Sequence, residues 1–150
     1  MDKIFLSTPI TNSLNKETGL MHTDIATKIS RIQECLISQR YEVFLAIDRE
    51  NWGRTIMSPS ECTPLDFYGV SNSSHMVVII SKYISDGVLI EIGWASALNI
   101  PITIFCEKES NLSPLVLGLP TIGEHQIFYV DFEDTEMIEI MLLERVKKCK

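Results

Sequence analysis

The sequence is poor in cysteine pairs, in basic residues and in long apolar runs, and each shortage excludes a class of protein. Its cysteines, Cys35, Cys62, Cys106 and Cys149, form no CxxC pair, so we expect neither a zinc site nor a disulfide framework. The 13 Lys and Arg are outnumbered by 20 Asp and Glu, which gives a net charge of -7. A nucleic-acid-binding face needs the opposite balance. We therefore expect no nucleic-acid partner, and reduced thiols in a cytoplasmic protein.

Long apolar segments and a glycine-rich cradle are also missing. Residues 76–80 (MVVII) have the length of a strand and cannot cross a bilayer. The apolar run in MDKIFLSTPI is too short for a signal peptide, and no glycine-rich phosphate loop follows it. We expect one domain, residues 1–150, without a membrane partner.

Short β-branched runs alternate with helical patterns along the chain. Strands are predicted at residues 3–7, 42–47, 76–80, 102–105 and 127–130. Most of these runs are apolar on both faces, which is typical of buried parallel strands. Helices are predicted near residues 21–36, 86–98 and 135–148. The order predicts an α/β fold with right-handed crossovers, a five-stranded, mainly parallel sheet and helices on both faces.

Two polar stretches, residues 9–20 and 48–64, fit neither pattern and are predicted to be loops. Both follow the carboxyl ends of predicted strands, where open α/β sheets bind their ligands. Long loops inside compact domains tend to be functional. The ligand site is therefore expected at this edge of the sheet.

Glu91 is an unusual residue for its surroundings. It lies between two isoleucines in a predicted helix whose only other charge is Asp86, and no residue three or four positions away is basic. A buried carboxylate without a partner is costly and usually persists for function. The alternative is a single carboxylate at the edge of an apolar helix.

Ser85, Asp86 and Gly87 open the same helix directly after a predicted strand. The free amide hydrogens of a helix N-terminus favour an anion such as phosphate. An ordinary helix cap has the same sequence, so both interpretations stay open here.

The motif S-x-G-x-x-x-E-x-G-x-A, present as Ser85, Gly87, Glu91, Gly93 and Ala95, resembles the nucleoside 2-deoxyribosyltransferase-like superfamily. That group includes deoxyribosyltransferases and nucleoside 5'-monophosphate N-glycosidases. The opening I-F-L-S-T-P resembles the family's first strand and substrate loop, and residues 112–118 resemble a run of the monophosphate-cleaving branch. The resemblance implies a single-domain, Rossmann- or flavodoxin-like three-layer sandwich that needs no cofactor or metal.

The resemblance also implies that Glu91 is a nucleophile that attacks the anomeric carbon of a nucleoside. Breaking an N-glycosidic bond builds positive charge on the sugar, which a carboxylate can stabilise or capture, as in retaining glycosidases. Asp66 falls about where the family keeps an aspartate ahead of its third strand, and it is the candidate for the second acid. Its alternative role is that of a helix-start residue after Pro64.

A serine at position 85 resembles the monophosphate branch, because the transferase branch tends to have an acidic residue there. Thr8 and Ser113 fall where that branch has further phosphate contacts. In the family the equivalent of Ser113 comes from a neighbouring subunit, which implies a homodimer with shared active sites.

The sequence departs from the family at two positions. Ile10 stands in place of an arginine, which Arg49 or Arg54 would have to replace. His75 stands in place of an aspartate, and a histidine hydrogen-bonded at a strand edge is the alternative to a substrate contact.

The predicted loop 48–64 contains Asp48, Asn51 and Trp52, which we expect to frame the nucleobase. An indole stacks on a base with about 1–3 kcal/mol in nucleic-acid sites, and Asn51 or Asp48 would read its edge. The alternative is a tryptophan that anchors the loop on the core.

Two other functions fit the same residues. A TIR-like NAD hydrolase also has a serine six residues before a catalytic glutamate, although Gly87 and Val88 stand where those domains have Trp-Cys. A non-catalytic module that senses a nucleotide is the other alternative.

Overall fold

The computed structural model describes residues 1–10, 13–81 and 83–148. In this part of the chain five strands form one parallel sheet in the order β2-β1-β3-β4-β5. The strands are β1 (Lys3–Ser7), β2 (Glu42–Leu45), β3 (His75–Ile80), β4 (Ile102–Cys106) and β5 (His125–Tyr129). This strand order is that of flavodoxin-like folds, so the predicted fold class is confirmed, with a sheet that is parallel throughout.

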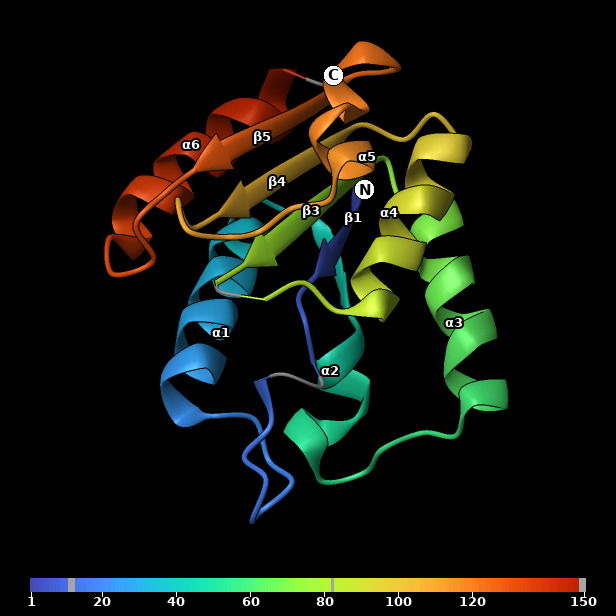
Figure 1. Ribbon diagram of the computed structural model, residues 1–150, viewed down its shortest axis with the longest axis vertical. Coiled ribbons are helices and arrows are strands. Elements are labelled where there is room, and N and C mark those ends of the chain that lie inside the picture. Colours follow the sequence, from blue (N-terminus) through green and yellow to red (C-terminus); the bar gives the residue numbers. More distant parts are fainter. Residues whose placement is uncertain (11–12, 82, 149–150) are drawn as a thin grey trace.

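Helices cover both faces of the sheet (Figure 1). The longer ones are α1 (Thr23–Ser38), α3 (Pro59–Ser71), α4 (Asp86–Ala97) and α6 (Thr135–Lys148). The short ones are α2 (Ala46–Arg49), η2 (Asn51–Gly53), α5 (Pro114–Leu117) and η3 (Leu119–Thr121). Helices α1 and α6 pack side by side on one face, and α3 and α4 on the other. The result is a sandwich of three layers.

The alternation of side chains along each strand builds two cores. In β3, Val77 and Ile79 join the core under α1 and α6, while Met76, Val78 and Ile80 join the core under α4. All six residues of β3 are buried. Two covered faces explain why residues 76–80 of β3 are apolar at consecutive positions rather than at alternate ones.

The prediction that residues 48–64 form a loop is wrong. Helix α2 begins at Ala46, inside the predicted strand 42–47, and α3 begins at Pro59. Ser58 and Glu61 form a capping box across the first turn of α3, Pro59 is the first residue of the helix, and both features favour a helix start. Pro64 therefore lies inside α3, so the alternative role of Asp66 as a helix-start residue is also wrong.

Several smaller expectations have clear outcomes. Ser85 is the N-cap of α4, as predicted. Cys35, Cys62 and Cys106 are free thiols, while Cys149 and part of the predicted loop 9–20, residues 11 and 12, lie outside the described residues. Among the helices described, none is both long and apolar enough to cross a membrane.

Candidate active site

Glu91 occupies a core position of α4. The buried residues of this helix are Val88, Glu91, Ile92 and Ala95, and this spacing marks one face of a helix. The carboxylate therefore stands where packing alone would place an apolar side chain, and only 9% of the residue is exposed. Its Oε2 accepts a short hydrogen bond from the hydroxyl of Ser7, the last residue of β1.

Burial raises the pKa of Glu91 to about 7, because the protein interior penalises the charged form. The hydrogen bond from Ser7 lowers this pKa, the negative charge of Asp66 raises it, and the positive charge of Arg49 lowers it. Near neutral pH the side chain is thus divided between the carboxylate and the acid. A carboxyl group poised in this way suits catalysis.

Arg49 and Asp66 form an ion pair beside Glu91. Arg49 ends α2, Asp66 lies within α3, and Nη2 of the arginine is 2.5 Å from Oδ1 of the aspartate. The guanidinium also stacks over the ring of Phe44, 4.8 Å from its centre. Burial raises the pKa of Asp66, and the charge of Arg49 opposes that effect. Glu50, which is also buried, adds a further negative charge that raises the pKa of Asp66.

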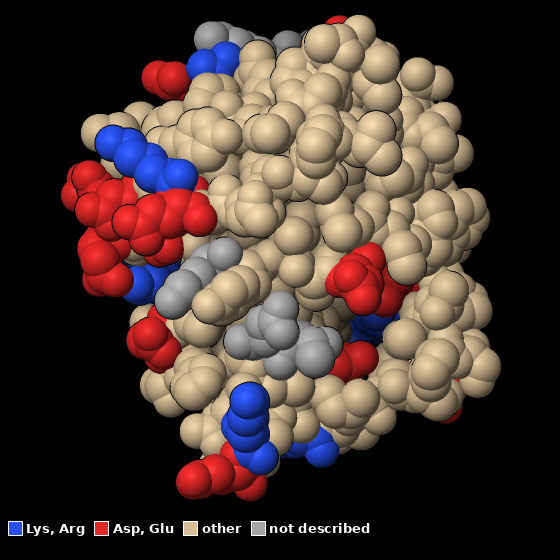
Figure 2. All heavy atoms as spheres, viewed as in Figure 1, with Lys and Arg blue, Asp and Glu red and all other residues tan. Residues whose placement is uncertain are grey.

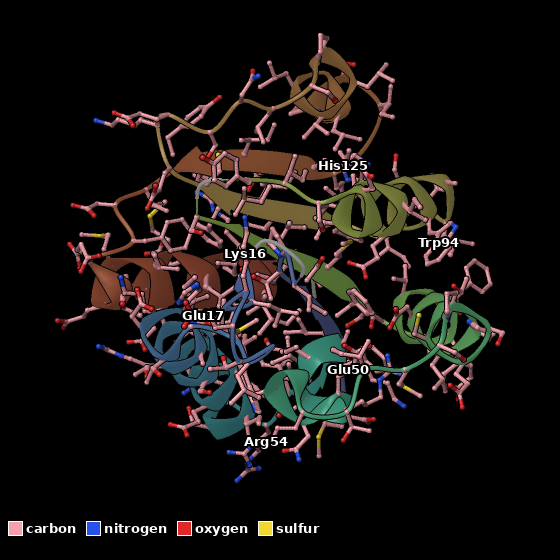
Figure 3. All side chains as sticks on the ribbon, turned by 60° about the horizontal axis from the view of Figure 1, so that its bottom comes forward. Lys16, Glu17, Glu50, Arg54, Trp94 and His125 are labelled. Atoms are coloured by element: carbon pink, nitrogen blue, oxygen red, sulfur yellow. The ribbon has the colours of Figure 1, made fainter. Side chains whose placement is uncertain are left out.

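These groups meet at the carboxyl ends of β1 and β2, the edge that faces forward in Figure 3. Ser7, Thr8, Ile10, Ala46 and Glu91 line a small cavity of about 10 Å³ there. Thr8 is buried directly after β1. Residues from β1, α2, α3 and α4 therefore converge at the edge where ligands bind open α/β sheets.

The start of α4 lies at the same edge, after β3. The Ser85 hydroxyl accepts the amide hydrogen of Val88 at 3.3 Å, so it satisfies one of the helix's free donors. Gly87 is exposed in the first turn, and an added Cβ there would meet only Ser85 Oγ, at 3.9 Å. The backbone at Gly87 is therefore open to close approach.

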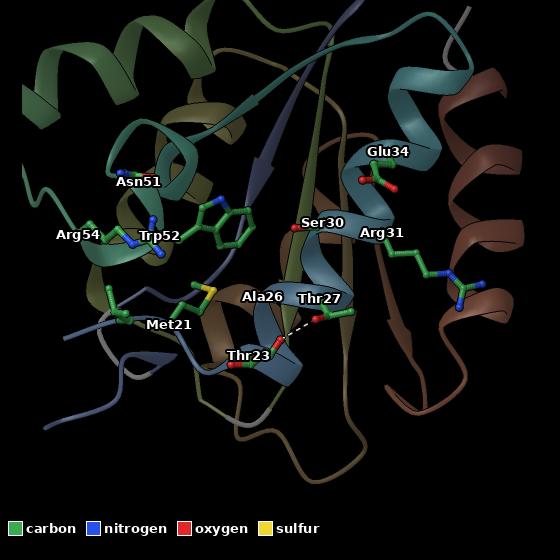
Figure 4. A pocket seen from close by; sticks show the side chains of 11 residues that line it. Met21, Thr23, Ala26, Thr27, Ser30, Arg31, Glu34, Asn51, Trp52 and Arg54 are labelled. Carbon is green, nitrogen blue, oxygen red and sulfur yellow. Dashed lines mark hydrogen bonds between the residues drawn. The ribbon is translucent and has the colours of Figure 1, made fainter. Parts of the chain in front are cut away.

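Trp52 and Asp48 lie on the side of α1 instead. Asp48 is exposed and accepts a 2.8 Å hydrogen bond from Gln33. The Trp52 indole packs partly on the core and lines a pocket of about 640 Å³ between η2 and α1 (Figure 4). Their role in binding a base stays a prediction, and none of the described contacts joins either side chain to Glu91.

The backbone around Trp52 is held in an unusual conformation. Asn51, Trp52 and Gly53 have φ values of 48°, 56° and 96°, in the left-handed region that costs energy for residues other than glycine. A side chain at Gly53 would come within 2.5 Å of the Gly19 carbonyl oxygen. Gly19 and Leu20, at the end of the predicted loop 9–20, therefore pack directly against η2.

Ser113 and His75 are separated from Glu91 within the chain. The Ser113 hydroxyl accepts the amide hydrogen of Val116 at 3.4 Å, and no described contact joins it to Glu91 or Ser7. His75 begins β3 and therefore lies at the opposite, amino edge of the sheet. Its Nε2 is hydrogen-bonded to the Thr103 hydroxyl at 2.9 Å, as the strand-edge alternative predicted.

Sequence reasoning missed Ser7 as a partner of Glu91, and it named Arg49 only as an alternative phosphate ligand. Ser7 is the first polar residue after the apolar run of β1, a signal that could have identified it. Of the two arginines considered, Arg49 lies at the site, whereas Arg54 is exposed and points outward (Figure 3). Within the described residues, no group of three or more His, Cys, Asp or Glu is arranged to hold a metal ion.

No family model and no curated protein matches the sequence, but solved structures do. The solution structure of BlsM is 30% identical with a TM-score of 0.82, and the match covers 98% of this chain and 90% of BlsM. The CMP N-glycosidase BcmB of Clostridium botulinum is 20% identical with a TM-score of 0.67, and the match covers 94% of this chain and 98% of BcmB.

A 2-deoxyribosyltransferase from the psychrotolerant bacterium Bacillus psychrosaccharolyticus is 21% identical with a TM-score of 0.59. The match covers 89% of this chain and 90% of the transferase. At these identities BcmB and the transferase show the shared fold, while the similarity to BlsM extends to the sequence over nearly the full length of both chains. The chain belongs to the nucleoside 2-deoxyribosyltransferase-like superfamily.

Proposed function

We propose that the protein cleaves the N-glycosidic bond of a nucleoside or nucleoside 5'-monophosphate, by hydrolysis or sugar transfer, with Glu91 as the nucleophile. The observation that carries this proposal is the burial of Glu91 at the carboxyl edge of the sheet, where Ser7 holds one of its oxygens. The superfamily supports it, because the solved structures with this fold include an N-glycosidase and a deoxyribosyltransferase.

Ser7 leaves Oε1 of Glu91 free to attack the anomeric carbon, because its hydrogen bond engages Oε2. As the new C–O bond forms, the C–N bond breaks and its electron pair leaves with the base. The sugar is then held as an ester of Glu91. Attack by water or by a second base on the same carbon breaks the ester and regenerates the carboxylate.

Asp66 is the candidate donor of the proton that the leaving base takes up. Its burial raises its pKa and so favours the protonated form, whereas Arg49 stabilises the ionised form left after the transfer. Arg49 also favours the ionised, nucleophilic form of Glu91. One arginine would therefore support both carboxyl groups at the stage where each is charged.

A 5'-phosphate would bind at the start of α4. The helix has 12 residues, and its first turn combines the Ser85 hydroxyl with the open backbone at Gly87. Thr8, at the end of β1, would add a second hydroxyl. This placement puts the phosphate on the same helix as Glu91, about two turns from it.

A homodimer through α3, α4 and α5 would bring Ser113 to a neighbouring active site. These helices and their ends present exposed apolar residues: Leu65, Phe67, Tyr68, Ile90, Leu98, Leu115 and Leu117. Figure 2 shows a broad surface with few charges over α4 and α5. Exposed apolar surface of this kind marks protein interfaces, and Ser113 is the N-cap of α5, next to the exposed Leu115.

The test of the reaction is release of free base from a panel of nucleoside monophosphates, nucleosides and NAD. We expect release from nucleosides or monophosphates, loss of activity in Glu91→Gln, and full activity in Glu144→Gln, which alters an exposed carboxylate on α6. Full activity of Glu91→Gln would refute the proposal. Release from NAD alone would indicate the NAD hydrolase, and thermal stabilisation by a nucleotide without any release would indicate a sensor.

Shared active sites are tested by mixing two inactive variants, Glu91→Gln and Ser113→Ala. If Ser113 serves the partner's site, a mixed dimer contains one site with both native residues, and activity rises on mixing. If Ser113 acts within its own chain, mixing restores nothing; if it has no role, Ser113→Ala is active without mixing. Sedimentation at increasing protein concentration measures the dimer independently.

A further inference from the structure

A second polar pocket lies at the opposite, amino edge of the sheet, where β3, β4 and β5 begin. It has a volume of about 440 Å³, and its lining includes His75, Thr103, His125, Gln126 and Arg145. His125 is seen at the start of β5 in Figure 3. The active site proposed above belongs to the carboxyl edge, so the two sites share no residue.

Three of the side chains that line the pocket have a buried nitrogen atom without a hydrogen-bond partner. His75 and His125 are only 4% and 5% exposed, yet Nδ1 of each ring has no partner among the described residues. Nε of Arg145 is likewise buried and unpartnered. Buried polar atoms are nearly always satisfied in proteins, so three exceptions around one cavity indicate a missing partner.

Arg145 brings a positive charge to this pocket. Its guanidinium lies over the ring of Phe128, 4.8 Å from the centre, and none of the salt bridges between described residues includes it. An arginine can only donate hydrogen bonds. The partner of its buried Nε–H must therefore be an acceptor, and a negatively charged acceptor binds arginine most strongly.

The shape of the chain maintains space for the imidazole of His125. A Cβ added at Gly123 would lie 2.5 Å from Nε2 of that ring, so any other residue in the turn before β5 would displace the imidazole from this position. Two histidines without a third ligand do not make a metal site, and no metal-binding group of three or more is found among the described residues. The donors fit an oxyanion instead.

We propose that this pocket binds an oxyanion, the phosphate or carboxylate group of a small molecule, through Arg145, His75 and His125. Neutral imidazoles donate a hydrogen bond through the ring nitrogen that carries the proton. In His75 that nitrogen is Nδ1 when the Thr103 hydroxyl donates to Nε2. Glu124 also lines the pocket and opposes an anion, but it is exposed, so solvent screens its charge.

The protein's three histidines make the test direct, because His22 is exposed at the start of α1 and serves as an internal control. The imidazole resonances are followed by NMR during titration with inorganic phosphate, and separately with acetate, at constant ionic strength. We expect saturable shifts of His75 and His125 while His22 stays in place. The anion that binds with the lower Kd identifies the chemical class of the ligand, phosphate or carboxylate.

Arg145→Gln should abolish both shifts, whereas Arg54→Gln, which removes an exposed arginine elsewhere, should leave them unchanged. The thermal midpoint of each variant without anion verifies that it is folded. If Arg145→Gln is unfolded, Arg145→Lys takes its place; it keeps the charge but loses the fork of N–H donors, so it should weaken both shifts. Shifts that fail to saturate, that occur equally in all three histidines, or that persist in folded Arg145→Gln would overturn the proposal. In that case a bound water would account for the unpartnered nitrogens.

Discussion

Replacing Glu91 with glutamine is expected to change the way stability depends on pH. Each pKa unit corresponds to about 1.4 kcal/mol, and the pKa of Glu91 rises from its ordinary 4.5 to about 7 on folding. The folded state therefore holds its proton more tightly than the unfolded state. Stability from this group is fully present below pH 4.5 and is lost as the pH rises through 7, by about 3 kcal/mol in total.

Glutamine has nearly the same shape, keeps an oxygen that can accept the Ser7 hydrogen bond, and does not titrate. The free energy of unfolding of Glu91→Gln, minus that of the wild type, should therefore grow by roughly 2–3 kcal/mol between pH 5 and pH 8. Urea denaturation followed by the fluorescence of Trp52 and Trp94 measures both proteins under identical conditions.

Subtracting the free energy of unfolding of the wild type from that of the variant cancels the contributions of the other titrating groups. Burial lowers the pKa of His75 to about 4 and lowers that of His125, so both histidines reduce stability as the pH falls, in the wild type and the variant alike. Glu144→Gln, at an exposed site, should show a constant difference from the wild type. A constant difference for Glu91→Gln as well would refute the reasoning, because it would mean that the carboxylate is solvated in the folded protein.

Three further predictions concern activity. Ser7→Ala removes the hydrogen bond that favours the ionised form of Glu91, so the pKa of Glu91 should rise further. The rising limb of kcat/KM against pH should then move to higher pH from about 7; an unmoved limb would show that Ser7 does not influence this pKa. Asp66→Asn removes the proposed proton donor and leaves Arg49 unpaired, so the rate of base release should fall at least about tenfold. The loss should be largest for substrates whose base is a poor leaving group, and equal losses for good and poor leaving groups would argue against proton donation. Ser85→Asp places a negative charge at the proposed phosphate site and should raise KM for monophosphates more than for free nucleosides; equal changes in a comparison of both substrate classes would contradict a phosphate there.

The strands and three of the four longer helices, α1, α4 and α6, could be predicted from local sequence, because β-branched runs buried on both faces and helical spacing are properties of neighbouring residues; α3 was missed. Glu91 was also identifiable, since its apolar neighbours reveal its burial. The bond from Ser7 to Glu91 joins residues 84 positions apart, and the ion pair between Arg49 and Asp66 depends on how α2 and α3 fold after β2. Neither follows from sequence spacing.

The segment after β2 is a second example of side-chain directions that could not be predicted from the sequence. Asp48 and Arg49 are adjacent in the sequence, but one turn of helix directs the first toward α1 and the second toward Asp66. Sequence reasoning that assumed a loop could not assign these opposite directions. Only the capping signals at Ser58, Pro59 and Glu61 were available to correct it.

The position of Glu91 on the inward stripe of α4 also has a consequence for laboratory evolution. Leucine or methionine would suit the neighbouring Val88, Ile92 and Ala95 better than an acid does, so a library sorted only for heat resistance should enrich such replacements. Such variants would be more heat-resistant but would lack the proposed nucleophile. Selection for thermal stability therefore has to be combined with selection for turnover in every round, because otherwise it would remove this carboxylate.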